Sequence, residues 1–172
     1  MRQLMRFVVA TACYWLVAWS TFKIEQASGG VASIWIASAL AVGYVVHRPA
    51  TSMPWFLAAV VLAVTLNGTL LYGRVDLAFL GGLVNAFEVF AVYVVLRRLD
   101  FRPGKVLSDR DVVAFLVLCV LLVPAVAAVF GATLRWADTD VPWLRLWIDW
   151  WRADAFGMFV LQIGRASCRE RV

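Results

Sequence analysis

Two apolar stretches of this sequence contain polar side chains that could bind a ligand, carry protons or form ion pairs. The candidate residues are Asn85, Glu88, Asp149, Trp151, Arg152 and Asp154. A charged side chain at the middle of a bilayer costs about 2.5 to 3.5 kcal/mol on insertion scales, so such residues are functional candidates by default. We therefore take these six residues as the candidate functional site.

Helical spacing places the charges of the second stretch on two faces. At 100° per residue, Arg145, Asp149 and Arg152 fall along one face with spacings suited to local ion pairs, and Asp154 points the other way. A helix that carries charge on two sides cannot be surrounded by lipid. We expect this helix to lie in the centre of a bundle or beside a water-filled cavity.

In the first stretch, Asn85 and Glu88 are three residues apart and therefore share a helix face. Glu88 and Arg152 lie at similar depths in two helices that run in the same direction, so we expect them to pair. The alternative is that the intramembrane charges only neutralise one another and fix helix packing. For Trp143 we favour an interfacial aromatic belt, which fits Trp151 less well because Trp151 lies deeper.

Composition indicates that the elements carrying these residues are membrane helices. The chain of 172 residues is 63% hydrophobic and 16% charged, with a mean hydropathy of +0.83. Its apolar blocks are about 20 residues long, the length that a helix needs to cross a bilayer. We therefore expect an all-α polytopic membrane bundle, with a kink at Pro124. The predicted spans are 5–22, 31–47, 54–73, 77–97, 112–133 and 143–162.

The distribution of Lys and Arg between the spans predicts the topology. On the side of the amino terminus, the loops carry Arg2, Arg6, Arg48, Arg97, Arg98, Arg102, Lys105 and Arg110. The opposite side has Lys23, Arg74 and Arg135. The cytoplasmic side normally carries the excess, so we expect a multi-pass protein of the bacterial inner membrane with its amino terminus in the cytoplasm. The net charge is +5, but the basic residues lie in short gaps between apolar blocks and form no continuous patch, which argues against a nucleic-acid partner.

Motifs for catalysis or metal binding are missing from the sequence. Cys13 and Cys119 lie in apolar blocks and form no CxxC or Cys/His spacing. There is no GxSxG or HExxH motif, and the single histidine, His47, lies at the end of a predicted span. We predict no catalytic residue, no metal ligand and no cofactor.

The last ten residues, 163–172, leave the apolar pattern abruptly and contain three arginines. All ten positions resemble the in-frame translation of a common sequencing-library adapter. The alternative is a basic segment that follows the last span. We therefore expect an integral-membrane domain over residues 1–162 that continues beyond Gln162 in the natural protein, followed by a non-native tail over residues 163–172.

Several short motifs, taken in order, resemble one family of membrane domains. They are Trp35 within Ile-Trp-Ile-Ala-Ser-Ala at the start of the second span, Asn85-x-x-Glu88, Leu-Arg-Arg-Leu-Asp-Phe-Arg-Pro followed by Arg110-Asp111-Val112, and Trp150-Trp151-x-x-Asp154-x-x-Gly157. From about residue 30 to residue 162 the chain resembles the first membrane-associated sensor (MASE) domain family. One departure is that the family usually has Trp-Pro where this chain has Trp35-Ile36, which leaves open whether a helix break occurs there.

The resemblance implies a sensory module of about eight spans, of which the last two are missing here. Such modules are fused to histidine kinase, diguanylate cyclase or phosphodiesterase outputs, in two-component or cyclic di-GMP signalling. It implies the lipid bilayer and the chain's own carboxy-terminal output domain as partners, with a second copy of the chain as a further candidate, and it defines no ligand. The alternative function is a fragment of a secondary transporter or channel, in which Glu88, Asp149 and Asp154 line a proton or substrate path.

Overall fold

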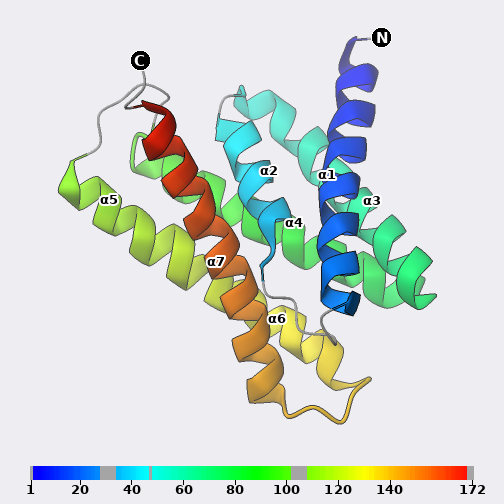
Figure 1. Ribbon diagram of the computed structural model, residues 1–172. Coiled ribbons are helices and arrows are strands. Elements are labelled where there is room, and N and C mark those ends of the chain that lie inside the picture. Colours follow the sequence, from blue (N-terminus) through cyan, green and yellow to red (C-terminus); the bar gives the residue numbers. More distant parts are fainter. Residues whose placement is uncertain (1, 28–33, 47, 102–107, 170–172) are drawn as a thin grey trace.

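The structure is a computed structural model, and it describes the chain except for residues 1, 28–33, 47, 102–107 and 170–172. The described secondary structure is entirely helical (Figure 1). The elements are α1 (Arg2–Ala27), α2 (Ile36–Val46), the 3-10 turn η1 (Ala50–Ser52), α3 (Met53–Tyr72), α4 (Val75–Arg98), α5 (Asp109–Phe115), the π-helical η2 (Leu116–Leu122), α6 (Val123–Trp136) and α7 (Trp143–Arg169).

Four helical segments within the described residues are long and apolar enough to cross a membrane. They are Phe7–Ile24, Ala50–Tyr72, Val75–Arg98 and Asp109–Trp136, the last of which runs through α5, η2 and α6 without a break. The expected all-α polytopic bundle is confirmed. The predicted number of about six spans agrees only loosely with these four segments, because α2 is short and α7 carries the charges named above.

The predicted span 31–47 is wrong as a full crossing. Within it, the described helix α2 has 11 residues, which at 1.5 Å per residue makes about 16 Å, roughly half the thickness of the hydrocarbon core. Ile34 and Trp35, which precede it, are not helical. Most of α2 is buried, and it packs against α1, α4 and α7. Its small residues, such as Ala39 and Ala41, are fully or almost fully buried and allow close approach of these neighbours.

Helices α3 and α4 form an antiparallel hairpin that turns at Gly73, whose φ of 69° favours glycine. The sequence predicts that Gly81 and Gly82 allow close helix contact. This is confirmed for Gly82, where a β-carbon would lie 2.9 Å from the carbonyl oxygen of Val61 in α3. A β-carbon on Gly81 would meet no atom within 4 Å, because Gly81 borders a cavity.

A π-helical stretch precedes Pro124, where the sequence predicts a kink. The hydrogen-bonding pattern widens over η2, which ends just before Pro124 in the first turn of α6. Proline has no N–H to donate to the preceding turn, and a π-helical stretch is one way in which a helix accommodates such an interruption. The long helix therefore changes its register before the proline.

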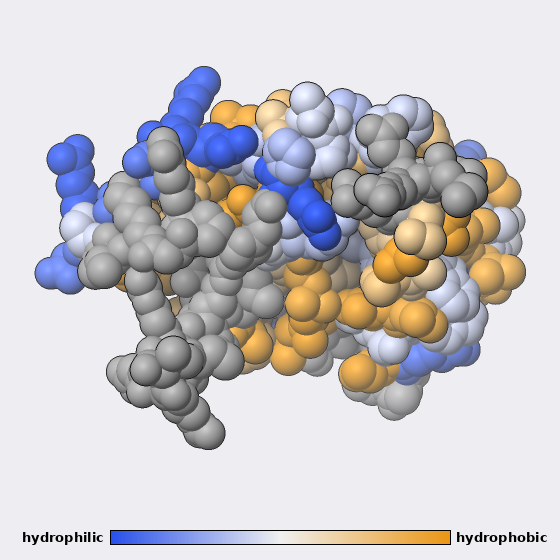
Figure 2. Space-filling model, turned by 90° about the horizontal axis from the view of Figure 1, so that it is seen from above, coloured by the Kyte–Doolittle hydropathy of each residue, from blue (hydrophilic) through white to orange (hydrophobic). Residues whose placement is uncertain are grey.

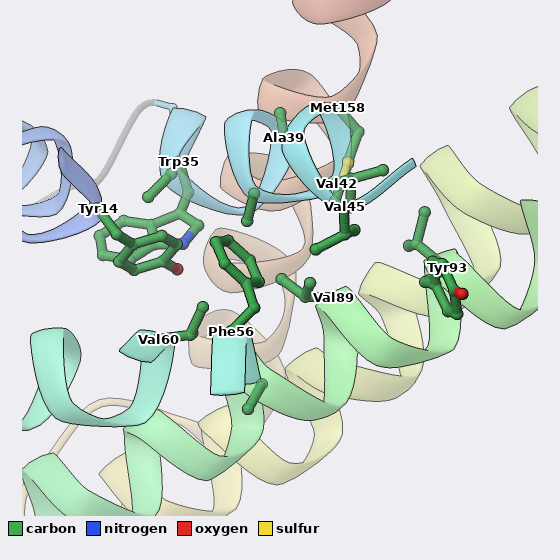
Figure 3. Close-up of a cluster of buried hydrophobic side chains, with 14 of the residues drawn as sticks. Tyr14, Trp35, Ala39, Val42, Val45, Phe56, Val60, Val89, Tyr93 and Met158 are labelled. Carbon is green, nitrogen blue, oxygen red and sulfur yellow. The ribbon is translucent and has the colours of Figure 1, made fainter. Parts of the chain in front are cut away.

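The buried core is built from α2, α3 and α4 around Phe56, Val60 and Val89, with Tyr14 of α1 beside Trp35 at one edge (Figure 3). On the outside, large apolar side chains such as Leu70, Leu83 and Phe130 are exposed, and apolar residues cover wide parts of the surface seen in Figure 2. An apolar exterior is what a helical bundle in lipid requires.

Candidate functional site

A cavity of about 510 Å³ lies between the helices and joins residues that are far apart in the sequence. We call it the interhelical cavity. At one end, its mouth, it is lined by Arg74, Arg135, Asp138 and Thr139, which belong to the α3–α4 turn, the end of α6 and the α6–α7 connection. The residues at its inner end are Trp35, Asn85, Trp150, Ala153 and Asp154. Asp154 lies 11 residues after the start of α7, so the inner end is about 16 Å from the mouth along that helix.

Ion pairs hold the mouth of the cavity together. Arg74 donates hydrogen bonds to both carboxylate oxygens of Asp76, at 3.1 and 3.0 Å, and lies 3.4 Å from Asp138. The bonds to Asp76 first, and then the nearby charge of Asp138, raise the pKa of the Arg74 guanidinium. Arg135 lies over the ring of Tyr72, 5.8 Å from its centroid. The α3–α4 turn is thereby tied to the α6–α7 connection.

One carboxyl group, that of Asp154, lies at the inner end of the cavity, and a second, that of Glu88, is buried close to it. Glu88 of α4 is 1% exposed and Asp154 of α7 is 3% exposed, and the two groups interact electrostatically. Ser38 of α2 lies beside Glu88, and Trp150 lies beside Asp154. Asn85 shares the buried face of α4 with Glu88, as the spacing of three predicts. We call Glu88 and Asp154 the carboxyl pair.

Several buried polar atoms around the carboxyl pair have no hydrogen-bond partner among the described residues. They are Oε1 of Glu88, Oγ of Ser38 and Nε1 of Trp35. Leaving a buried polar group unsatisfied costs about 1 to 3 kcal/mol, and more for a charged group. Tyr14 and Trp35 lie next to one another beside this region (Figure 3), and the Tyr14 hydroxyl is 3.5 Å from Oδ1 of Asn85. These atoms can therefore form further hydrogen bonds, in which Oε1 of Glu88 accepts, Nε1 of Trp35 donates and Oγ of Ser38 can do either.

The expected pairing of Glu88 with Arg152 is wrong. Arg152 lies 3.8 Å from Asp149 on α7, and its side chain is 62% exposed. Arg145 lies 3.9 Å from the same carboxylate. The reason is rotational: positions 152 and 154 point to opposite sides of α7, and the side of Asp154 faces the bundle. The local ion pairs predicted for Arg145, Asp149 and Arg152 are confirmed, but Asp149 borders the cavity as well as Asp154 does, so the two groups of charges are less separated than predicted. Helix α7 borders the cavity, the second of the two arrangements expected.

Three tryptophans of α7 hold this helix to the long helix beside it. Trp147 donates its indole N–H to the carbonyl oxygen of Ala125 at 3.0 Å, and Trp151 donates to that of Leu121 at 3.0 Å. Trp143 donates to the hydroxyl of Thr133 at 3.2 Å. The rings of Trp147 and Trp151 are stacked, with centroids 5.4 Å apart. Trp151 therefore lies outside the cavity, in what we call the tryptophan ladder, defined by Trp143, Trp147 and Trp151.

Helix α2 begins directly on α7. The amide of Trp35 donates to the carbonyl oxygen of Ala153 at 2.9 Å, and the carbonyl of Trp35 leaves no room for a β-carbon on Gly157. The helix begins at Ile36, and Ile34 and Trp35 before it are not helical, so a helix break occurs at the position that the sequence left open. This contact brings Ser38 and the start of α2 to the carboxyl pair.

Sequence reasoning missed Tyr14 and Ser38 as residues of this site. Both lie in apolar segments, and both are buried. A tyrosine in the middle of a predicted span was the available signal for Tyr14, because a buried phenol hydroxyl usually needs a partner. Nothing in the sequence around Ser38 distinguishes it from the small residues that serve helix packing.

A comparison with protein-family models matches the MASE1 family over residues 3–163. Comparisons with curated proteins and with solved structures gave no match. The matched region includes α1, which lies before the motifs that carry the resemblance, and it takes in the whole interhelical cavity. Because this match spans almost the entire chain and the fold is an apolar helical bundle, the chain belongs to the MASE1 family of membrane-associated sensory domains of signalling proteins.

Proposed function

We propose that residues 1–162 form the sensory input domain of a bacterial inner-membrane signalling protein, with the amino terminus in the cytoplasm. The interhelical cavity receives the stimulus, and α7 passes the change, through the two spans expected to follow it, to a cytoplasmic output domain. That output is a diguanylate cyclase, a phosphodiesterase or a histidine kinase. The observation that carries this proposal is that α7, from which the chain continues toward the spans expected beyond Gln162, supplies Trp150, Ala153 and Asp154 to the inner end of the cavity.

The contacts of α7 provide two packing surfaces that can respond differently to an occupant. On one side, the tryptophan ladder fixes α7 to η2 and α6. On the other side, α7 contacts α2 through Trp35 and faces α4 through the carboxyl pair. A ligand can shift an equilibrium only if it binds two states differently. An occupant that touches Asp154 changes the contacts of α7 with α2 and α4, whereas the hydrogen bonds of the tryptophan ladder stay in place. This difference favours a rotation or shift of α7.

The test is to fill the cavity in the full-length parent protein. Gly81 borders the cavity, and its β-carbon position meets no atom within 4 Å, so Gly81→Leu adds volume to the cavity without a backbone clash. Ala58→Leu is the matched control, because Ala58 is exposed on α3 and lies outside the cavity lining. We expect Gly81→Leu to give normal abundance and an output that no longer changes across growth conditions, and Ala58→Leu to respond as the wild type does. A normal response of Gly81→Leu at normal abundance would rule out the cavity as the input site.

A secondary transporter is the second candidate, and one observation favours it. The interrupted start of α2 lies beside two intramembrane carboxyl groups, an arrangement that transporters use for substrates and coupling ions. The two functions are separated by flux measurements on the full-length parent in proteoliposomes with an imposed proton gradient. Gradient-driven uptake of a solute that Glu88→Gln abolishes would favour the transporter, and the absence of flux with an intact output response would favour the sensor.

A further inference from the structure

We propose that the interhelical cavity binds an organic cation, with a primary ammonium group against Asp154 and an apolar or aromatic body among the surrounding rings. This inference rests on the proposed function, because it names the ligand class of the proposed sensory site. It uses the carboxyl pair, the aromatic lining and the shape of the cavity.

The inner end of the cavity is acidic. Asp154 lines the cavity, Glu88 interacts with it electrostatically, and both side chains are almost fully buried. Within the described part of the chain, no lysine or arginine lies against either carboxyl group. Buried charges in proteins are paired or neutralised, because an isolated one is very costly. A cationic ligand supplies the missing partner, and the unsatisfied Oε1 of Glu88 adds a further acceptor atom close to the carboxyl group of Asp154.

The lining of the cavity contains aromatic rings. Phe22, Trp35, Tyr72 and Trp150 all border the cavity. Aromatic faces attract cations, and tryptophan does so most strongly. The ring of Trp150 is fixed in place by Gly131 of α6, where a β-carbon would lie 2.5 Å from it. One cavity ring, that of Tyr72, already has the guanidinium of Arg135 over its face.

The volume of the cavity and the small number of possible metal ligands in it favour an organic ligand. The volume of about 510 Å³ lies in the range of sites for organic ligands, roughly 300 to 1,000 Å³. A bare divalent ion would need more oxygen or nitrogen ligands than two carboxyl groups supply, and calcium, for example, takes about 6 to 8 oxygen ligands. In the described ranges, no group of three or more His, Cys, Asp or Glu side chains could hold a metal ion. The geometry favours a molecule with one charged end.

The mouth of the cavity does not block the entry of a cation. A ring of free guanidinium groups would repel an entering cation, but Arg74 is bound to Asp76 and lies close to Asp138. The two carboxylates around this one guanidinium compensate its charge. The mouth therefore presents a compensated ion-pair cluster, whereas the carboxyl group of Asp154 at the inner end has no basic side chain beside it in the described part of the chain.

The experiment compares three probes of nearly the same shape: 2-phenylethylammonium, 2-phenylethanol and 3-phenylpropionate. Binding to the purified protein in lipid nanodiscs is measured by isothermal titration calorimetry, and the heats from empty nanodiscs are subtracted. We expect 2-phenylethylammonium to bind at least about tenfold more tightly than 2-phenylethanol, as one charge-assisted hydrogen bond requires. We expect 3-phenylpropionate to bind most weakly. Equal binding of the ammonium and the alcohol, tighter binding of the carboxylate, or no binding of any probe would overturn the proposal.

Two variants test which carboxyl group produces the preference for the ammonium probe over the alcohol. Asp154→Asn keeps the shape of the side chain and should reduce the ratio of ammonium to alcohol affinity to about one. Asp140→Asn removes an exposed carboxylate outside the cavity lining and should leave the ratio unchanged. If Asp154→Asn retains the wild-type ratio, the site is not at the carboxyl pair and the proposal fails. Because the ratio in the wild type is itself decisive, the test does not depend on how well a variant folds.

The binding result and the proposed function can fail separately. If Gly81→Leu abolishes the output response and the alcohol binds as well as the ammonium, the cavity is the input site and the ligand class is wrong. If the ammonium is preferred and Gly81→Leu leaves the output response normal, the cation site exists and the sensory assignment of the cavity is wrong.

Discussion

The backbone of Trp35 packs directly on Gly157, so that α2 begins against α7 with no space for a side chain between them. The same contact includes the hydrogen bond from the Trp35 amide to the Ala153 carbonyl. Helix α2, which follows Trp35, is short and packs against α7. The carboxyl pair, the cavity and α7 all meet at this point.

Gly157→Ala should destabilise the protein by about 1 to 3 kcal/mol, the usual cost of inserting an atom into a packed interior. The control is Gly81→Ala, which adds the same methyl group where no atom lies within 4 Å. Thermal unfolding of the purified proteins should show a lower Tm for Gly157→Ala and an unchanged or slightly raised Tm for Gly81→Ala. Equal Tm values for the two variants would mean that the contact between Trp35 and Gly157 is not as close as described.

The tryptophan ladder should contribute stability through its hydrogen bonds. Trp147→Phe and Trp151→Phe keep an aromatic ring but remove the indole donor, so each should cost about 0.5 to 1.5 kcal/mol. Trp55→Phe is the control, because Trp55 is 61% exposed. The measurement is chemical or thermal unfolding followed by tryptophan fluorescence, with the losses compared among the three variants. A loss for Trp55→Phe as large as those for the ladder variants would argue against the ladder.

The carboxyl pair should show non-additive energetics. Glu88→Gln removes the interaction between the two buried groups. Asp154→Asn should therefore change the free energy of unfolding by less in the Glu88→Gln background than it does in the wild type. For residues in contact we expect a coupling free energy of about 0.5 to 3 kcal/mol. Stability of the single and double variants is measured in detergent, with Glu88→Gln plus Asp149→Asn as the control cycle. Additive effects in the first cycle would show that Glu88 and Asp154 do not interact.

The helices that the sequence predicts well are those with long apolar blocks. The spans 54–73 and 77–97 correspond to Met53–Tyr72 and Val75–Arg98, because a backbone in lipid must satisfy its hydrogen bonds internally and a helix does so. The interruption at Trp35 was not predictable from local pattern, since the apolar run continues across it. At this point the backbone of Trp35 contacts Gly157, more than a hundred residues away in the sequence, and such a contact cannot be read from a local pattern.

For the candidate site, the sequence identified which positions are polar and which of them share a helix face. Asn85 with Glu88, and Arg145 with Asp149 and Arg152, follow from the helical repeat alone. The partner of Glu88 was mispredicted because depth along a helix can be counted from the sequence, whereas the rotation of one helix against another depends on packing.

Topology provides a test of the membrane assignment. Asp109→Cys and Asp140→Cys place thiols at exposed positions, near the start of α5 and in the α6–α7 connection. The neighbouring Ser108 is unsuitable for a cysteine substitution, because its side chain caps α5 in a capping box with Asp111. A membrane-impermeant maleimide added to intact spheroplasts should label Asp140→Cys, and Asp109→Cys should react only after lysis. Labelling of both variants in intact spheroplasts would contradict the predicted orientation.

The central claim, that the interhelical cavity is the input site, is tested most directly by modifying its wall chemically in the full-length parent protein. In a background without other reactive cysteines, Gly81→Cys and the exposed control Ala58→Cys are treated with a membrane-permeant benzyl methanethiosulfonate, and mass spectrometry verifies the modification. The enzymatic output is then measured before and after treatment, which requires no knowledge of the natural stimulus. We predict a change in output for the modified Gly81→Cys variant and none for Ala58→Cys. Full modification of Gly81→Cys with an unchanged output would contradict the account.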